Sequence, residues 1–168
     1  MRLLTAADMP RLMEIVVQPN VLEALSFEIR RPTVEEVISG LTLAAPGTRT
    51  EVFGIAAGDG KLLGTVALAD QHPVNRNGFL TNLTLIKGAP FGAAMAAVRW
   101  ILDHGFNVRN LHRIECIVWD SNRITPILAK RIKGLVLEGK KRQAVWRQGR
   151  YMDITIYGLL REDYGKRN

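Results

Sequence analysis

The stretch Asn77–Phe106 reads NGFLTNLTLIKGAPFGAAMAAVRWILDHGF and contains, in order, a strand, a turn with glycines and a helix. Phe79–Ile86 is rich in apolar and β-branched residues between polar and glycine residues, which predicts a buried strand. From Phe91 onward, apolar residues recur at helical spacing with alanines between them, which predicts a long helix that Gly105 ends. The other elements can be placed around this unit.

The turn between the strand and the helix reads KGAPFG, from Lys87 to Gly92. Small residues let other atoms approach the backbone, and Pro90 suits a first helical turn. Free amides at the positive end of a helix dipole typically bind phosphate. The alternative is that the small residues only allow tight packing of strand and helix. Neither GxxxxGK[ST] nor GxGxxG occurs, which disfavours an ATP P-loop and a dinucleotide fold.

Composition predicts one globular domain over residues 1–168. The chain is long enough for a real core, and 47% of its residues are hydrophobic. No apolar run reaches membrane-spanning length and no signal-peptide pattern opens the chain, so we expect a cytoplasmic protein without membrane contact. Cys116, the only cysteine, lies in the apolar run IECIVW and is expected to be packed. The histidines lack metal-ligand spacing, so no metal is expected.

The net charge is +7, with the excess of cations in the second half of the chain. This balance favours an anionic partner: a phosphorylated cofactor, an acidic protein surface or nucleic acid. Aromatic residues make up only 7% of the chain and are not interleaved with the basic run, which disfavours nucleic acid.

Before the central unit, we expect two helical segments and a hairpin. Thr33 and Glu36 have capping-box spacing at the start of the second helix, which should end near Ala44. The first helix is expected to run through Val16, after a short strand at Arg2–Thr5 and before a helical turn and loop at Asn20–Arg31. The hairpin is expected to consist of strands at Glu51–Ala57 and Leu62–Ala69, joined by an Asp-Gly turn.

After the central unit, Leu111–Trp119 is predicted to be a strand parallel to Phe79–Ile86, because a crossover helix separates the two. A helix opened by Asn122 should run to about Lys133. Leu135–Trp146 and Tyr151–Leu160 should form a closing hairpin, whose strands could pair between the subunits of a homodimer.

This order of elements resembles the GNAT acetyltransferase superfamily. NLHRIECIVWDSNRITPILAKRIKGLVLEG and RQGRYMDITIYGLLREDY are similar to the branch that acetylates protein N-termini, including those of ribosomal proteins. The similarity extends over residues 50–164. It implies an α+β fold with a mixed, mostly antiparallel central sheet of about six or seven strands and helices on both faces. It also implies transfer of acetyl from acetyl-CoA to a primary amine of a protein N-terminus or a small molecule.

The resemblance further implies where acetyl-CoA binds. Backbone amides of the turn would hold the pyrophosphate, a bulge in the fourth strand would polarise the thioester, and an asparagine would contact the cofactor arm. The residues at these positions are Asn82, Leu83, Lys87, Gly88, Ala89, Phe91, Gly92, Ala93 and Asn122. Lys87 stands where Arg or Gln is usual, and Pro90, which has no amide hydrogen, stands where Gly is usual.

Acetyl transfer requires a neutral amine, an oxyanion donor and a proton for the departing thiolate. The helix opened by Asn122 has no tyrosine, and Thr125 is its only hydroxyl residue. Candidate bases are Asp70, His72 and Glu28. Two alternatives remain: a GNAT-shaped binding protein without transfer activity, which Lys87 and Pro90 favour, and a basic module that binds RNA or the ribosome.

Overall fold

The structure is a computed structural model that describes residues 1–24, 32–42, 47–90, 92–120, 122, 124–147 and 149–165. It contains a seven-stranded sheet of order β1-β2-β3-β4-β5-β7-β6. The strands are β1 (Arg2–Leu3), β2 (Arg49–Ala56), β3 (Leu62–His72), β4 (Asn77–Leu85), β5 (Arg113–Trp119), β6 (Val136–Arg147) and β7 (Arg150–Leu160). Among these described strands, β4 and β5 pair in parallel and the other neighbours pair antiparallel, so the sheet is mixed and mostly antiparallel, as predicted.

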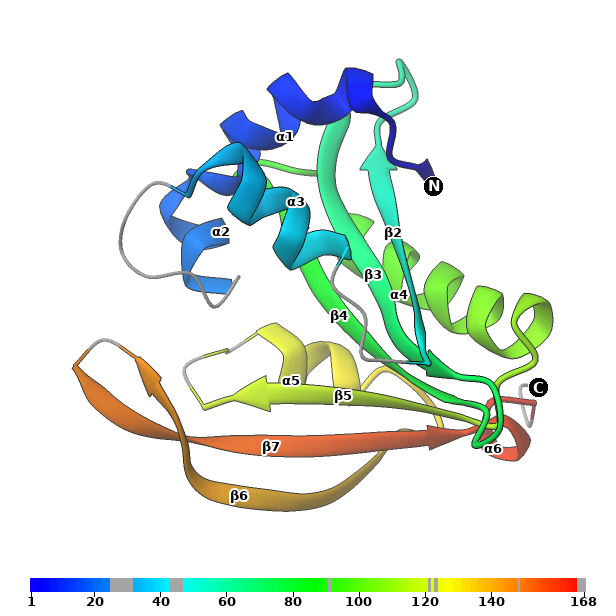
Figure 1. Ribbon diagram of the computed structural model, residues 1–168. Helices are drawn as coiled ribbons and strands as arrows, with labels where there is room; N and C mark the ends of the chain where they lie inside the picture. Colours follow the sequence, from blue (N-terminus) through cyan, green and yellow to red (C-terminus); the bar gives the residue numbers. More distant parts are fainter. Residues whose placement is uncertain are drawn as a thin grey trace.

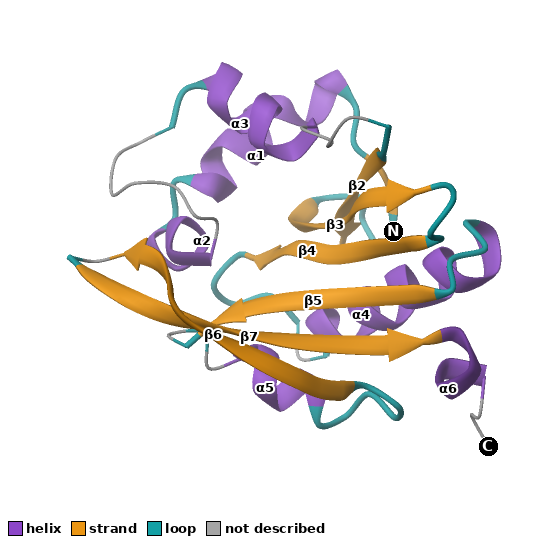
Figure 2. Cartoon of the chain, turned by 60° about the horizontal axis from the view of Figure 1, so that its bottom comes forward, coloured by secondary structure: helices purple, strands orange, loops and turns teal. Residues whose placement is uncertain are grey.

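Helices cover both faces of the sheet (Figures 1 and 2). They are α1 (Met9–Val16), α2 (Pro19–Ala24), α3 (Val34–Thr42), α4 (Ala93–Asp103), α5 (Ile124–Ala129) and α6 (Arg161–Gly165), with a 3-10 turn at Ala6–Asp8 and a π-helical turn at His104–Val108. Helices α1, α2 and α3 contact strands β2 to β4 on one face. Helix α4 packs on the other face, with α5 beside it.

Each face has its own hydrophobic core. On the α4 side, Val98 and Ile101 pack with Leu68 of β3, Ile114 of β5 and Leu159 of β7. On the opposite side, residues of α1 and α3 pack with the start of β3; they include Leu12, Ile15, Val37 and Leu62. Helical spacing in α1 and α4 therefore produced the apolar faces that cover the sheet.

Local signals in the sequence are confirmed by hydrogen bonds. The Thr33 hydroxyl accepts from the Glu36 amide at 3.2 Å, and the Glu36 carboxylate accepts from the Thr33 amide at 2.8 Å, which is a capping box. The turn at Gly60 closes the β2–β3 hairpin, where the Gly60 amide donates to the Ala57 carbonyl at 3.0 Å.

Two predicted helix ends are wrong. The helical conformation does not stop at Gly105, because a π-helical turn, His104–Val108, follows α4 directly. A Cβ on Gly105 would lie 2.6 Å from Cδ1 of Ile114, so this glycine allows the turn to pack closely on β5. Helix α5 ends at Ala129 and not at Lys133. The α6 turn was not predicted, and the first strand stops at Leu3.

A buried carboxylate on β2 joins segments that are distant in the sequence. Glu51 is 7% exposed and receives hydrogen bonds from Arg109, including one from Nε at 2.6 Å. The His104 ring and the Gln71 amide also lie 3.2 Å from its Oε2. Burial alone would raise the pKa of Glu51, but the bonds from Arg109, His104 and Gln71 lower that pKa from 4.5 to about 2.

In the described part of the chain, no helix combines the length and hydropathy needed to cross a bilayer.

Candidate active site

The two parallel strands at the centre of the sheet separate after a short paired segment. Register partners run only from Asn77 with Arg113 to Phe79 with Glu115. Beyond Phe79 the strands diverge, as Figure 2 shows for β4 and β5. The sheet is therefore open between the later halves of these strands.

A bulge in β4 accompanies this separation. Thr65 of β3 pairs with Thr84, but Ala67 pairs with Thr81, so β4 carries one extra residue at this point. Asn82 in the bulge has a positive φ of 52°, which asparagine tolerates better than most residues. The bulge lies at the position that the family resemblance implies.

Buried hydroxyls hold the bulge in place. The Thr65 side chain is 1% exposed, and its Oγ1 lies 3.2 Å from the Asn82 carbonyl oxygen and 2.9 Å from Oγ1 of Thr84. These threonines were missed in the sequence, because alternation within a strand does not reveal which hydroxyls face one another across a bulge.

A cavity of about 360 Å³ occupies the opening between β4 and β5. Its wall is mostly apolar, with Leu80, Val98, Ile114 and Leu128 among the contributors. The polar residues of the wall are Thr81, Asn82, Glu115, Cys116, Asn122, Thr125 and Tyr157. A cavity of this size with few polar groups is typical of a small-molecule site.

The turn between β4 and α4 contains two glycines in the left-handed region, Gly88 at φ 83° and Gly92 at φ 88°. A Cβ on either would meet no atom within 4 Å, so ligand atoms could approach both backbones. Gly92 is the N-cap of α4, and among the described residues no side chain caps this helix. The amides of Ala89 and Ala93 donate within the turn, to the carbonyls of Ile86 and Pro90.

Four of the predicted site residues line the cavity: Asn82 and Leu83 from the bulge, and Asn122 and Thr125 at the start of α5. Oδ1 of Asn122 also accepts from the amides of Ile124 at 3.1 Å and Thr125 at 3.0 Å, so this residue caps α5. Lys87, whose amide donates to Oε1 of Gln18 at 3.4 Å, lies in the turn after β4. Glu28 and Phe91 lie outside the described residues.

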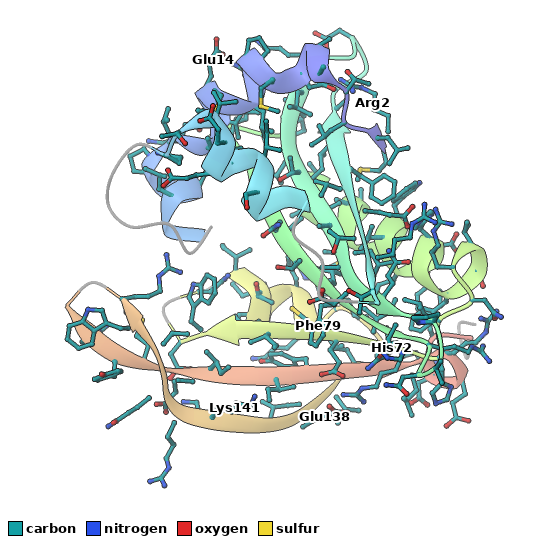
Figure 3. All side chains as sticks on the ribbon, in the orientation of Figure 1. Arg2, Glu14, His72, Phe79, Glu138 and Lys141 are labelled. Atoms are coloured by element: carbon teal, nitrogen blue, oxygen red, sulfur yellow. The ribbon has the colours of Figure 1, made fainter. Side chains whose placement is uncertain are left out.

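Asp70 and His72 do not line the cavity. Both belong to the last residues of β3. Figure 3 shows His72 next to the turn that leads into β4. Nδ1 of His72 accepts from the amides of Val74 at 3.2 Å and Asn75 at 3.1 Å. Oδ1 of Asp70 accepts from the Thr48 hydroxyl at 3.2 Å. His72 therefore supports the turn between β3 and β4, and Asp70 contacts the residue before β2.

The cavity wall instead receives side chains of β5 and β7, among them Glu115 and Tyr157. Glu115 accepts from Nε of Arg113 at 3.0 Å, and Nη1 of Arg113 donates to Glu138 at 2.7 Å. These bonds, the one to Glu138 foremost, raise the pKa of Arg113 above its ordinary value. Burial raises the pKa of Cys116 to about 11, so this residue is a neutral thiol at pH 7.

Within the described ranges, no three His, Cys, Asp or Glu side chains gather in a way that could hold a metal ion.

Comparison with known proteins agrees with this geometry. No family model matches the chain. A Bacillus subtilis protein named "Putative ribosomal N-acetyltransferase YdaF" is 26% identical over 170 residues, which cover 97% of this chain and 91% of that protein.

Solved structures match the fold closely. Spermidine N-acetyltransferase from Vibrio cholerae, in complex with CoA and spermine, superposes with a TM-score of 0.80 at 21% identity over 98% of this chain and 96% of that one. A structure described as a probable acetyltransferase gives a TM-score of 0.78 at 24% identity over 96% and 92% of the two chains. In its fold, and in its sequence along nearly the whole length, this chain is therefore similar to N-acetyltransferases.

Proposed function

We propose that this protein is an acetyl-CoA-dependent N-acetyltransferase that transfers acetyl to a primary amine by direct attack on the thioester. The observation that carries the proposal is the cavity between β4 and β5. Its wall includes the bulge of β4, and β4 leads into the turn with the left-handed glycines that precede α4. A ligand with a slender arm and a phosphorylated head, such as acetyl-CoA, fits this combination. The arm suits the apolar opening, and the phosphates suit the turn at a helix N-terminus.

Each part of the site has a role in this reaction. The backbone of the turn and the first turn of α4 bind the pyrophosphate. The cofactor arm occupies the opening in the sheet, where backbone groups of the Asn82–Leu83 bulge face the thioester. Asn122 contacts the arm from α5, and the hydroxyls of Thr125 and Tyr157 can supply a proton to the departing thiolate.

The acceptor enters from the opposite side of the opening and attacks the thioester carbonyl as a neutral amine. Glu115 is the carboxylate of the cavity wall and can receive the amine's proton directly or through water. New carbon–nitrogen bond formation then expels the CoA thiolate, and holding the two reactants in line supplies much of the rate enhancement.

Alanine substitutions at Gly88 and Gly92 test the cofactor site. An L-residue at these φ values costs about 1–2 kcal/mol, and the turn relaxes by moving its amides. Because a hydrogen bond to a charged group contributes about 1.5–3 kcal/mol, we expect acetyl-CoA affinity to fall about tenfold or more in each variant, measured by titration calorimetry.

Gly60→Ala is the matched control. Gly60 has a φ of 86° and equally open surroundings, but it lies in the β2–β3 turn. The Gly60→Ala variant should lose about as much stability as the Gly88 and Gly92 variants but bind acetyl-CoA as the wild type does. Absence of acetyl-CoA binding by the wild-type protein would overturn the proposed function.

A second candidate is a GNAT-shaped protein that binds CoA without transferring acetyl. Pro90 has no amide hydrogen, and the amide of Ala89 already donates to the Ile86 carbonyl, so these two positions of the turn do not donate to a phosphate. This candidate predicts acetyl-CoA binding with no transfer to any peptide or small amine.

A further inference from the structure

The face of the sheet on which the acceptor must approach is covered only in part. Helices α1, α2 and α3 contact β2, β3 and β4, and Figure 1 shows β5, β6 and β7 extending beyond them. Ile117 of β5 is 40% exposed on this uncovered part. An extended segment can therefore lie along β5 and the β6–β7 hairpin while one end reaches the cavity.

Register pairs identify the side chains on this face, because residues directly opposite one another share a face. Trp119 pairs with Ile154, and Ile154 pairs with Lys141. Arg147 pairs with Arg150, which lies four residues from Ile154 on β7 and so on the same face. Lys141, Arg147 and Arg150 thus face the same side as Trp119; we call them the hairpin cations.

The inner end of this face is acidic. Glu115 shares the face of Trp119 by alternation along β5, and it lines the cavity. Arg113 pairs with both Glu115 and Glu138, so one guanidinium faces two carboxylates. An ammonium group is favoured next to Glu115.

The outer end is basic. Arg147 lies over the Trp119 ring, with its guanidinium carbon 4.4 Å from the ring centroid, and Nη2 donates to the Leu22 carbonyl of α2 at 3.5 Å. Since Trp119 lines the cavity, these contacts make the hairpin continuous with the site. Among the described residues, neither Lys141 nor Arg150 has an ion pair; the nearby carboxylates of Asp120 and Asp153 bind Lys140 instead.

We propose that the acceptor is an acidic protein N-terminus, bound with its amine at Glu115 and its carboxylates at the hairpin cations. The inference rests on the proposed function. Glu115 and Trp119 are four residues apart, which is about 13 Å along a strand, so the acidic residues follow the amine by roughly four positions in an extended peptide. A polyamine with one amine at Glu115 would place its other ammonium groups near the hairpin cations, and this repulsion disfavours polyamines as acceptors.

The test compares steady-state acetylation of short peptides that differ only at their fourth and fifth residues. These are two aspartates, two asparagines or two lysines, and spermidine is assayed alongside. We expect KM to be about tenfold lower for the aspartate peptide than for the lysine peptide, with similar kcat, and the difference to shrink at high salt.

Charge reversal locates the effect. Lys141→Glu/Arg150→Glu should invert the preference, so that the lysine peptide has the lower KM. Lys61→Glu/Arg99→Glu changes the net charge equally at exposed positions in the β2–β3 turn and on α4, and it should keep the wild-type preference. Acetyl-CoA affinity, measured by calorimetry, should be the same in both variants.

The outcomes separate the two proposals. Acetylation with equal KM for all peptides, preference for spermidine, or preference for acidic peptides that survives Lys141→Glu/Arg150→Glu would overturn the acceptor assignment and leave the enzyme intact. The assignment also fails if these cations bind RNA and do not affect peptide KM. Absence of acetyl-CoA binding by the wild-type protein would overturn the proposed enzymatic function as well.

Discussion

Gly64→Ala is expected to destabilise the protein by about 3 kcal/mol and to abolish cofactor binding, because the added Cβ has no room. It would lie 2.0 Å from the carbonyl oxygen of Thr84 and 3.0 Å from Cα of Leu85. Both contacts are with backbone, so no side chain can rotate away, and β3 and β4 must separate next to the Asn82 bulge.

The measurements are thermal denaturation and calorimetric titration with acetyl-CoA. For a chain of this length we expect a loss of about 6–12 °C in Tm. Gly139→Ala is the matched control, because Gly139 also lies in a strand but its Cβ would meet nothing within 4 Å. A Gly64 variant with wild-type stability and wild-type affinity would show that close approach of β3 and β4 does not shape the site.

Glu51→Gln is expected to cost about 2–4 kcal/mol at pH 7, because it leaves the Arg109 guanidinium without its buried anionic partner. Glu51 joins β2 to the turn after α4, so the loss should appear as a lower denaturation midpoint without loss of the folded state at room temperature. Glu14→Gln is the control: its carboxylate is 65% exposed beside Arg11, and we expect a change below about 0.5 kcal/mol.

The pH dependence of this effect has a definite sign. The pKa of Glu51 is about 2 in the folded protein against 4.5 ordinarily. The charge therefore contributes its full stability above pH 4.5, and this contribution is lost as pH falls toward 2. The stability difference between wild type and Glu51→Gln should shrink over this window. A difference that stays constant from pH 7 to pH 3 would exclude the charge as its source.

The sequence alone determined the elements whose causes are local. The Thr33–Glu36 capping box, the turn at Gly60 and the strand–turn–helix unit around Lys87–Gly92 depend on residues a few positions apart, and all occur as predicted. The parallel pairing of β4 with β5 followed from the crossover helix between them, and the resemblance to a known family added the bulge near Asn82.

Only the tertiary structure decided which side chains meet in the site. Glu115 and Tyr157 looked like ordinary strand residues until the separation of β4 from β5 opened a cavity beside them. Asp70 and His72 were candidate bases by residue type, but their side chains bind Thr48 and the amide of Val74, away from the cavity. The role of Gly105, the clash at Gly64 and the partners of Glu51 likewise depend on segments far apart in the chain. Strand alternation indicates which face a residue occupies, but distances between segments depend on how the whole sheet twists and packs.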